Sequence, residues 1–130
     1  MSENMEMMGS IARAISDDSS VAKIDWVELS IVFSFEEDGF CAGHFGYAYD
    51  QEGVPTPFTL DSMDAETAAS SYREWLRQEG DKGALKMLFQ FNRATRKVNA
   101  EFEYEDTSRW KVTPKNIDVI TEELRPNLGS

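Results

Sequence analysis

The sequence predicts an α+β fold, in which an antiparallel β-sheet has helices packed on one face. Four segments alternate apolar and polar residues with the period of a β-strand, and three others repeat apolar residues with the period of a helix. Turn-forming residues join successive strands, as β-hairpins require. The predicted order of elements is α-β-β-β-α-β-β-α, and hairpins on both sides of the central helix favour antiparallel pairing.

The chain has the length of one domain with one hydrophobic core. It contains 130 residues, of which 41% are hydrophobic and 12% aromatic. A domain of this size buries roughly two-thirds of the surface that its unfolded chain exposes. Because no repeat or linker divides the sequence, residues 1–130 are predicted to form a single domain.

The first predicted element is a helix over residues 3–16. Met8, Ile11, Ala12 and Ile15 recur at spacings of three and four, which places them on one face. The sequence DDSS at positions 17–20 consists of residues that favour turns, so the helix is predicted to end there.

The first strand is predicted over residues 23–35, and an acidic turn follows it. The inward face of this strand consists of Val27, Leu29, Ile31, Phe33 and Phe35. Its opposite face carries Trp26, Glu28, Ser30, Val32 and Ser34. The turn is formed by Glu36, Glu37, Asp38 and Gly39. Glycine suits its last position because it can adopt a positive φ.

The second strand is predicted over residues 40–49 and contains two internal glycines. The alternate positions of this strand, which share one face, include Cys41, Phe45, Tyr47 and Tyr49. Gly43 and Gly46 indicate a bulge or the close approach of another backbone. A short third strand is predicted over residues 55–60. Pro55 and Pro57 favour the edge of the sheet because proline cannot donate a ladder hydrogen bond.

The second half of the chain repeats the alternation of helix and hairpin. Residues 64–78 are predicted to form a helix with Asp64 as its N-cap and the apolar stripe Ala65, Ala68, Ala69, Tyr72, Trp75 and Leu76. Residues 84–92 and 97–106 are predicted to pair as a hairpin. Its inward residues are Leu85, Met87, Phe89, Phe91, Val98, Ala100, Phe102 and Tyr104. A last helix is predicted from Thr113-Pro114 with the stripe Ile117, Ile120 and Leu124.

The charge of the chain is strongly negative and uneven. The net charge is -11; residues 1–66 hold 14 acidic and two basic residues, a net of -12. Residues 67–130 hold 10 acidic and 11 basic residues, a net of +1. Such a protein repels nucleic acid and anionic membranes and attracts basic partners. The charge therefore predicts a protein partner, with solubility as the alternative explanation.

The sequence also predicts a cytoplasmic protein. Cys41 is the single cysteine, so no disulfide can form within the chain, which fits a reducing compartment. No run of about 18 apolar residues is present to span a membrane. The N-terminal residues include Glu3 and Glu6 and lack the basic and apolar regions of a secretory signal.

No motif for catalysis, metal binding or cofactor binding is found. Cys41 and His44 are three residues apart in a strand, so without a bulge they face opposite sides. The sequence contains no CxxC, HExxH, EF-hand or phosphate-binding pattern. We therefore expect no catalytic residue, no metal and no cofactor. A small enzyme using clustered carboxylates is the alternative, and it requires two acids with separated pKa values in one cleft.

Three glutamates alternate with aromatic residues near the end of the predicted hairpin. With Phe102 and Tyr104 inward, Glu101, Glu103 and Glu105 face outward, and such a ladder needs opposing cations such as Lys86. If the strands at 23–35 and 97–106 approach each other, an acidic surface around an aromatic side chain results, which suits a basic partner. A solvated face that blocks aggregation is the alternative. The predicted partner-binding residues are Trp26, Glu28, Glu36, Glu37, Asp38, Glu101, Glu103 and Glu105.

The chain resembles the YezG-like bacterial immunity protein family over roughly residues 5–125. The resemblance rests on the strand WVELSIVFSF, the helix SSYREWLRQ and the hairpin FQFNRATRKVNAEFEYED, with Trp26-Val27 and FEYED at 102–106 as local markers. The tail RWKVTPKNIDVITEELRP departs from the family pattern. The resemblance implies a cytoplasmic protein that binds a cognate toxin, often a nuclease, and it implies no catalytic residue.

The charge favours the same function, because nucleases are commonly basic and an acidic inhibitor can mimic phosphates. The leading hypothesis is a non-catalytic immunity protein that neutralises a basic toxin through an acidic surface. The alternative is a general interaction adaptor or homodimeric module without a toxin partner, in which Trp26 and Trp110 form a self-association patch.

Overall fold

The predicted α+β class and element order are confirmed in the computed structural model, which describes residues 3–77 and 83–126. The helices are α1 (Glu3–Asp17), α2 (Ser19–Ala22), α3 (Asp64–Leu76) and α4 (Ile120–Glu123). The strands are β1 (Glu28–Phe35), β2 (Cys41–Tyr49), β3 (Pro55–Phe58), β4 (Lys86–Asn92) and β5 (Val98–Glu103). The one-turn helix α2 lies within the segment that was predicted only as a break. None of the helices within the described ranges has the length and apolar character of a bilayer span.

The five strands form one antiparallel sheet in the order β3-β2-β1-β4-β5. The predicted β4–β5 hairpin is present, and the proline-containing β3 lies at an edge as expected. β1 is the central strand, and β4 separates it from β5, the second edge strand. β1 and β5 are therefore not paired with each other, and each pairs with β4.

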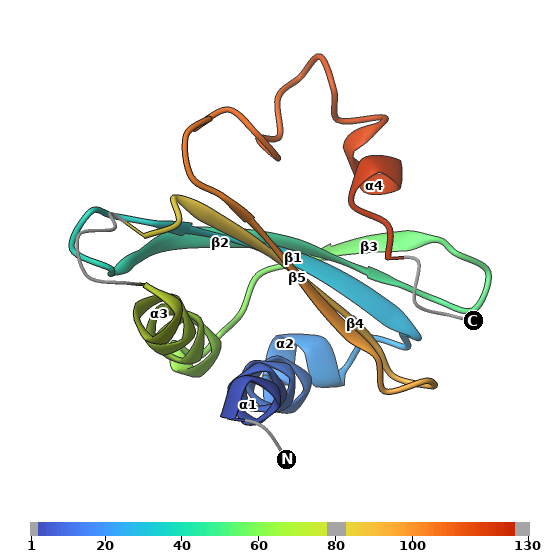
Figure 1. Ribbon diagram of the computed structural model, residues 1–130. Helices are drawn as coiled ribbons and strands as arrows, with labels where there is room; N and C mark the ends of the chain where they lie inside the picture. The colour runs from blue at the N-terminus through green and yellow to red at the C-terminus, as the bar shows by residue number, and fades with distance from the viewer. Residues whose placement is uncertain (1–2, 78–82, 127–130) are drawn as a thin grey trace.

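The larger core lies between the sheet and helices α1, α2 and α3, which cover one face (Figure 1). Ile11 and Ile15 of α1 are fully buried against the inward residues of β1 and β4. These inward residues include Leu29, Ile31 and Phe89, as the strand alternation predicts. The prediction that helices share one face of the sheet therefore holds for α1, α2 and α3.

The opposite face of the sheet is covered by the C-terminal segment that contains α4 (Figure 1). Its apolar side chains form a second core with the sheet, consisting of Val32, Tyr47, Tyr49, Leu88, Trp110, Ile120 and Leu124. The Tyr49 hydroxyl donates a hydrogen bond of 2.6 Å to the Thr121 carbonyl. The Leu124 carbonyl accepts from the Ser30 hydroxyl and, at 3.0 Å, from the Gln90 amide. These hydrogen bonds, of which the two to Leu124 are buried, hold α4 on the face of the sheet that was predicted to have no helix.

The last helix is shorter than predicted. It begins at Ile120 and not at Thr113, and Ile117 is 54% exposed. The Asn116 side chain accepts a hydrogen bond of 2.7 Å from the Thr113 amide and donates one of 2.8 Å to the Lys111 carbonyl. Because the Asn116 side chain satisfies these backbone groups, the segment forms turns in place of the first helical residues.

The two glycines of β2 have the roles that their positions predicted. Ser34 pairs with Gly43 and Phe35 pairs with Cys41, so Ala42 is an extra residue and the strand has a bulge. At Gly46, a Cβ atom would lie 2.8 Å from the Ser30 carbonyl oxygen, so another backbone does approach closely. The bulge changes which way the side chains at the start of β2 point. Because Gly46 has no Cβ atom, β1 and Phe58 of β3 can pack closely against β2.

Candidate protein-binding surface

One end of the sheet gathers exposed carboxylates from two separate turns. At this end the Phe35 amide donates to the Leu85 carbonyl at 2.9 Å, and the Leu85 amide donates to the Glu103 carbonyl at 2.8 Å. These bonds place the last residues of β1 and β5 at the same end of the sheet, about 10 Å apart across two strand spacings. The exposed acidic residues that follow these ends, named here the acidic end, are Glu36, Glu37, Asp38 and Glu105.

The β1–β2 turn holds three of these carboxylates outward. Its geometry depends on Gly39, which has the predicted positive φ, 95°. The Glu36 amide donates to the Phe40 carbonyl at 2.8 Å, and Asp38 Oδ1 accepts from the Phe40 amide at 3.1 Å. The side chains of Glu36 and Glu37 have no role in closing this turn, so both are available to a partner.

The predicted ladder of Glu101, Glu103 and Glu105 divides into different environments. Glu101 is exposed, and Glu105 follows the last residue of β5. The Glu103 carboxylate accepts hydrogen bonds from the Asp106 amide at 3.0 Å, the Glu105 amide at 3.1 Å and Arg109 at 3.0 Å. These bonds lower the pKa of Glu103 to about 2. Glu103 therefore anchors the turn after β5, and its charge is already paired.

The cations near this ladder differ from the predicted partners. Lys86 lies opposite Glu103 in the β4–β5 register, but its ammonium donates to the Arg109 carbonyl at 2.8 Å. Arg109 pairs with Glu103, whereas the Asp106 carboxylate accepts from the Ser108 amide and hydroxyl. The loop after β5 thus satisfies its own charges and leaves Glu101 and Glu105 exposed.

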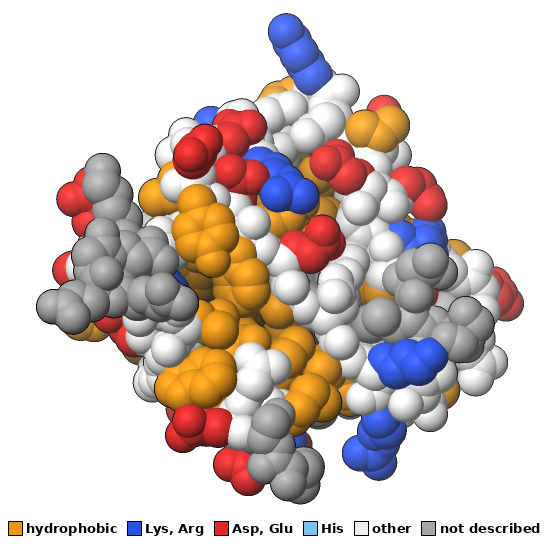
Figure 2. Space-filling view, in the orientation of Figure 1, with side chains coloured by type: hydrophobic (Ala, Val, Ile, Leu, Met, Phe, Trp, Pro, Cys, Tyr) orange, Lys and Arg blue, Asp and Glu red, His pale blue; other side chains and the backbone are white. Residues whose placement is uncertain are grey.

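An aromatic row lies next to the acidic end and runs from helix α3 to the end of the edge strand β5. It consists of Trp75, Tyr72, Phe102 and Tyr104, whose successive ring centroids are 6.2, 6.0 and 6.5 Å apart. Its terminal members are exposed, Trp75 by 42% and Tyr104 by 52%. Figure 2 shows hydrophobic side chains gathered over this face, with acidic side chains above and below them. Tyr104 lies on the predicted side of the sheet, next to Phe102 and α3, but it is not buried, because it lies beyond the last residue of β5.

Trp26 is not on the surface, which corrects the predicted partner-binding set. Its side chain is 2% exposed and packs in the larger core, 6.0 Å from the Phe91 ring. The Arg93 guanidinium lies 3.8 Å from its ring centroid and covers it. Since β1 begins at Glu28, the strand alternation that placed Trp26 outward does not apply to it. Trp110 is also buried, at 5% exposure, so neither tryptophan can form the self-association patch.

Glu28 is separated from the other predicted acidic residues. It pairs with Asn92 at the far end of β1 and accepts a hydrogen bond of 3.2 Å from the Asn92 amide. The predicted approach of the first and fifth strands does not occur, because β4 lies between them. The surface residues that sequence reasoning missed are Trp75 and Tyr104. Two features of the sequence indicated their exposure. Trp75 belongs to a wide apolar stripe on the predicted helix, whose outer residues need not be buried. Tyr104 comes directly before the turn-forming residues Glu105-Asp106.

Cys41, His44 and Glu66 meet around the β2 bulge. The extra residue puts Cys41 and His44 on the same face of the sheet, which corrects the expectation of opposite faces. His44 Nδ1 lies 2.7 Å from Glu66, and His44 Nε2 accepts from the Leu60 amide at 3.0 Å. Burial and the Glu66 carboxylate raise the pKa of the Cys41 thiol to about 12. The cluster therefore fixes the loop at Leu60 and keeps the thiol protonated, which does not activate it as a nucleophile.

The fold and this surface define a class of protein: an acidic α+β domain with an aromatic row, exposed at both ends, between helix α3 and the edge strand β5. No protein-family model matches the chain, and no curated protein sequence matches it. The resemblance to the YezG-like immunity family therefore stays a prediction.

Proposed function

We propose that this protein is a non-catalytic immunity protein that binds and neutralises a basic protein toxin, most simply a nuclease. The observation that carries the proposal is the acidic end, whose carboxylates are exposed beside the aromatic row. Charged residues around exposed aromatic side chains are the composition of a protein-binding surface. The family resemblance supports the same function.

The electrostatics of this surface favour a basic partner. Basic side chains next to the acidic end are already engaged by the protein itself. Arg73, 3% exposed, donates to the Ala84 carbonyl at 2.7 Å and to Glu74 at 2.6 Å, and Arg109 pairs with Glu103. With a net charge of -11, the long-range field steers a basic toxin toward the protein and speeds association. A nuclease surface that binds phosphates has the complementary charge.

The edge position of β5 adds a second means of recognition. An edge strand has backbone donors and acceptors that are not paired within the sheet, so a partner can bind them. Tyr104 and Trp75 can then supply the apolar contacts that usually dominate affinity. Charge would set the rate of encounter, and the aromatic row would set the lifetime of the complex.

The titration of three carboxylates outside the acidic end argues against acid catalysis by them. Hydrogen bonds lower the pKa of Glu103, Asp106 and Glu122. A carboxyl group that acts as a general acid at neutral pH requires the opposite shift. The hydrogen bonds that lower these pKa values come from the protein's own backbone and from Ser108, Arg109 and Arg125, so these carboxylates stabilise its loops.

A charge-reversal variant tests the proposed surface. Glu36→Lys/Glu37→Lys is expected to weaken binding of the basic toxin encoded by the adjacent gene by about 100-fold, mainly through slower association. The matched control is Asp25→Lys/Glu52→Lys, which makes the same change of charge at exposed positions toward the opposite end of the sheet. The control should weaken binding by less than about fivefold. Binding kinetics measured from low to high salt would provide both values.

Two results would contradict the proposal. If neither the adjacent gene product nor a basic nuclease binds the protein, the immunity function is wrong. If both double variants weaken binding equally, net charge and not the acidic end determines the interaction.

A homodimeric module is the second candidate, and the open edge of β5 with the aromatic row beside it favours this function. Two copies could pair through this edge and bury Trp75 and Tyr104. Sedimentation at increasing protein concentration discriminates: a concentration-independent monomer counts against the homodimer.

A further inference from the structure

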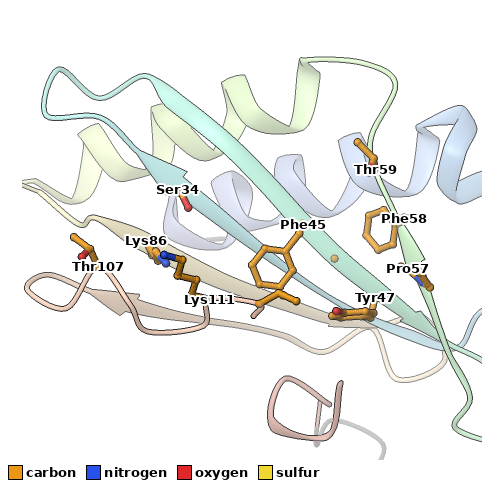
Figure 3. Close-up of a pocket in the computed structure, with 11 residues that line it drawn as sticks. Ser34, Phe45, Tyr47, Pro57, Phe58, Thr59, Lys86, Thr107 and Lys111 are labelled. Atoms are coloured by element: carbon orange, nitrogen blue, oxygen red, sulfur yellow. The ribbon is translucent and has the colours of Figure 1, made fainter. Parts of the chain in front are cut away.

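A groove lies on the second face of the sheet, between β2, β3 and the segment after β5. Its volume is about 780 Å³, within the range of small-molecule sites. Its walls include Phe45, Tyr47, Pro57 and Val112, together with Lys86 and Lys111 (Figure 3). This groove is distinct from the acidic end and the aromatic row, and the inference below does not depend on toxin binding.

The charge of the groove is opposite to that of the protein. In a chain with a net charge of -11, the described residues that line the groove include two lysines and no aspartate or glutamate. Burial and the nearby Lys111 lower the pKa of Lys86, and attraction from Asp106 opposes them. Two ammonium groups held close together repel each other, and an anion between them would remove this repulsion.

The polar and apolar parts of the groove are separated. Figure 3 shows Lys86, Lys111, Ser34 and Thr107 toward one end and Phe45, Tyr47, Pro57 and Phe58 toward the other. The rings of Phe45 and Tyr47 meet edge to face at 6.3 Å. Lys86 donates to the Arg109 carbonyl at 2.8 Å, and an ammonium group has three donors, so it can hold the loop and also bind an anion.

We propose that this groove binds a small amphipathic anion. A carboxylate, sulfonate or phosphate head would lie between Lys86 and Lys111, and an apolar body would lie against Phe45 and Tyr47. The charge complementarity argues for an anion, and the aromatic wall argues for an apolar body over a fully polar ligand such as inorganic phosphate.

Two fluorescent probes with the same aromatic body test the proposal. Anilinonaphthalene sulfonate carries an anionic head, and N-phenylnaphthylamine lacks it. The sulfonate is expected to bind with a blue-shifted emission, and Lys111→Met should weaken its binding about tenfold while leaving the uncharged probe unaffected. The matched control is Lys115→Met, an exposed lysine outside the groove, which should change neither affinity. Phe45→Ala should weaken both probes.

Thermal unfolding of each variant checks that the fold is intact, and the exposed position of Lys111 makes Lys111→Met the variant of choice. Binding of the sulfonate that is insensitive to both Lys111→Met and Phe45→Ala would overturn the proposal, as would equal affinity for the two probes. Sedimentation with and without the sulfonate provides a further arm. A dimer that Lys111→Met abolishes would assign the groove to an acidic segment of a second copy and would also overturn it.

Discussion

Asp18→Ala is expected to lower the free energy of unfolding by about 3 kcal/mol, because it removes four hydrogen bonds and leaves the buried donors of Ser20 without partners. The Asp18 side chain, 5% exposed, joins the α1–α2 junction to the loop before α3. Its carboxylate accepts hydrogen bonds from the Ser20 amide and hydroxyl at 3.0 and 2.7 Å, from the Asp61 amide at 3.0 Å and from the Ser62 amide at 2.9 Å. Urea unfolding would measure the loss.

The neighbouring residue provides the control for this prediction. Asp17→Ala removes the same charge at an exposed position and should change stability by less than about 0.5 kcal/mol. An equal loss for the two variants would show that general charge or helix content, and not the buried hydrogen bonds, determines the effect.

The contribution of Asp18 should also depend on pH. Burial opposes its ionisation, but the hydrogen bonds outweigh burial and lower its pKa from 3.8 to about 2. A lowered pKa in the folded state contributes stability above the unfolded value, and this contribution is lost as the pH falls through the folded value. The stability difference between the wild type and Asp18→Asn should therefore be constant near pH 5 and decrease between about pH 4 and pH 2. A difference that does not change over this interval would contradict the assignment.

Gly46→Ala is the second substitution with a large expected effect. The new Cβ atom would lie 2.7 Å from Phe58 Cζ and 2.8 Å from the Ser30 carbonyl oxygen. The carbonyl belongs to the central strand and cannot move without disturbing its pairing with β2 and β4. We expect a loss of about 2–4 kcal/mol in the free energy of unfolding, as for other overpacked sites.

Gly43→Ala is the matched control for this effect. A Cβ atom at Gly43 would have no neighbour within 4 Å, so the substitution should change stability by less than about 1 kcal/mol. Thermal or urea unfolding of the two variants measures the difference directly. Similar losses would mean that glycine is required for backbone flexibility in β2 and not for close packing.

Local periodicity was sufficient to predict most of the elements. The alternation of Leu29, Ile31 and Phe33 correctly identified the inward face of β1, because adjacent side chains of a strand point to opposite sides. The same rule failed for the direction of Trp26 and for the burial of Tyr104, which lie just beyond the ends of β1 and β5. Alternation holds only while the backbone is extended, and the sequence does not mark the last extended residue.

The second core required contacts that are distant in the sequence. Val32 and Tyr49 face away from α1–α3, and the residues that bury them are Ile120 and Leu124. A signal was present, since β1 is apolar on both faces around Ile31-Val32-Phe33, as in strands that are covered on both sides. It could not indicate which segment provides the cover.

By itself the sequence determined most of the elements, their order, the hairpins and the exposure of the acidic turn after β1, because these depend on the backbone geometry of neighbouring residues. Only the tertiary structure decided that β4 lies between β1 and β5, so that Glu28 is remote while the carboxylates of the acidic end are gathered. It also decided that Lys86 and Lys111 share a groove. The physical reason is that strand order and face coverage follow from burying apolar surface of remote segments, which no local pattern specifies.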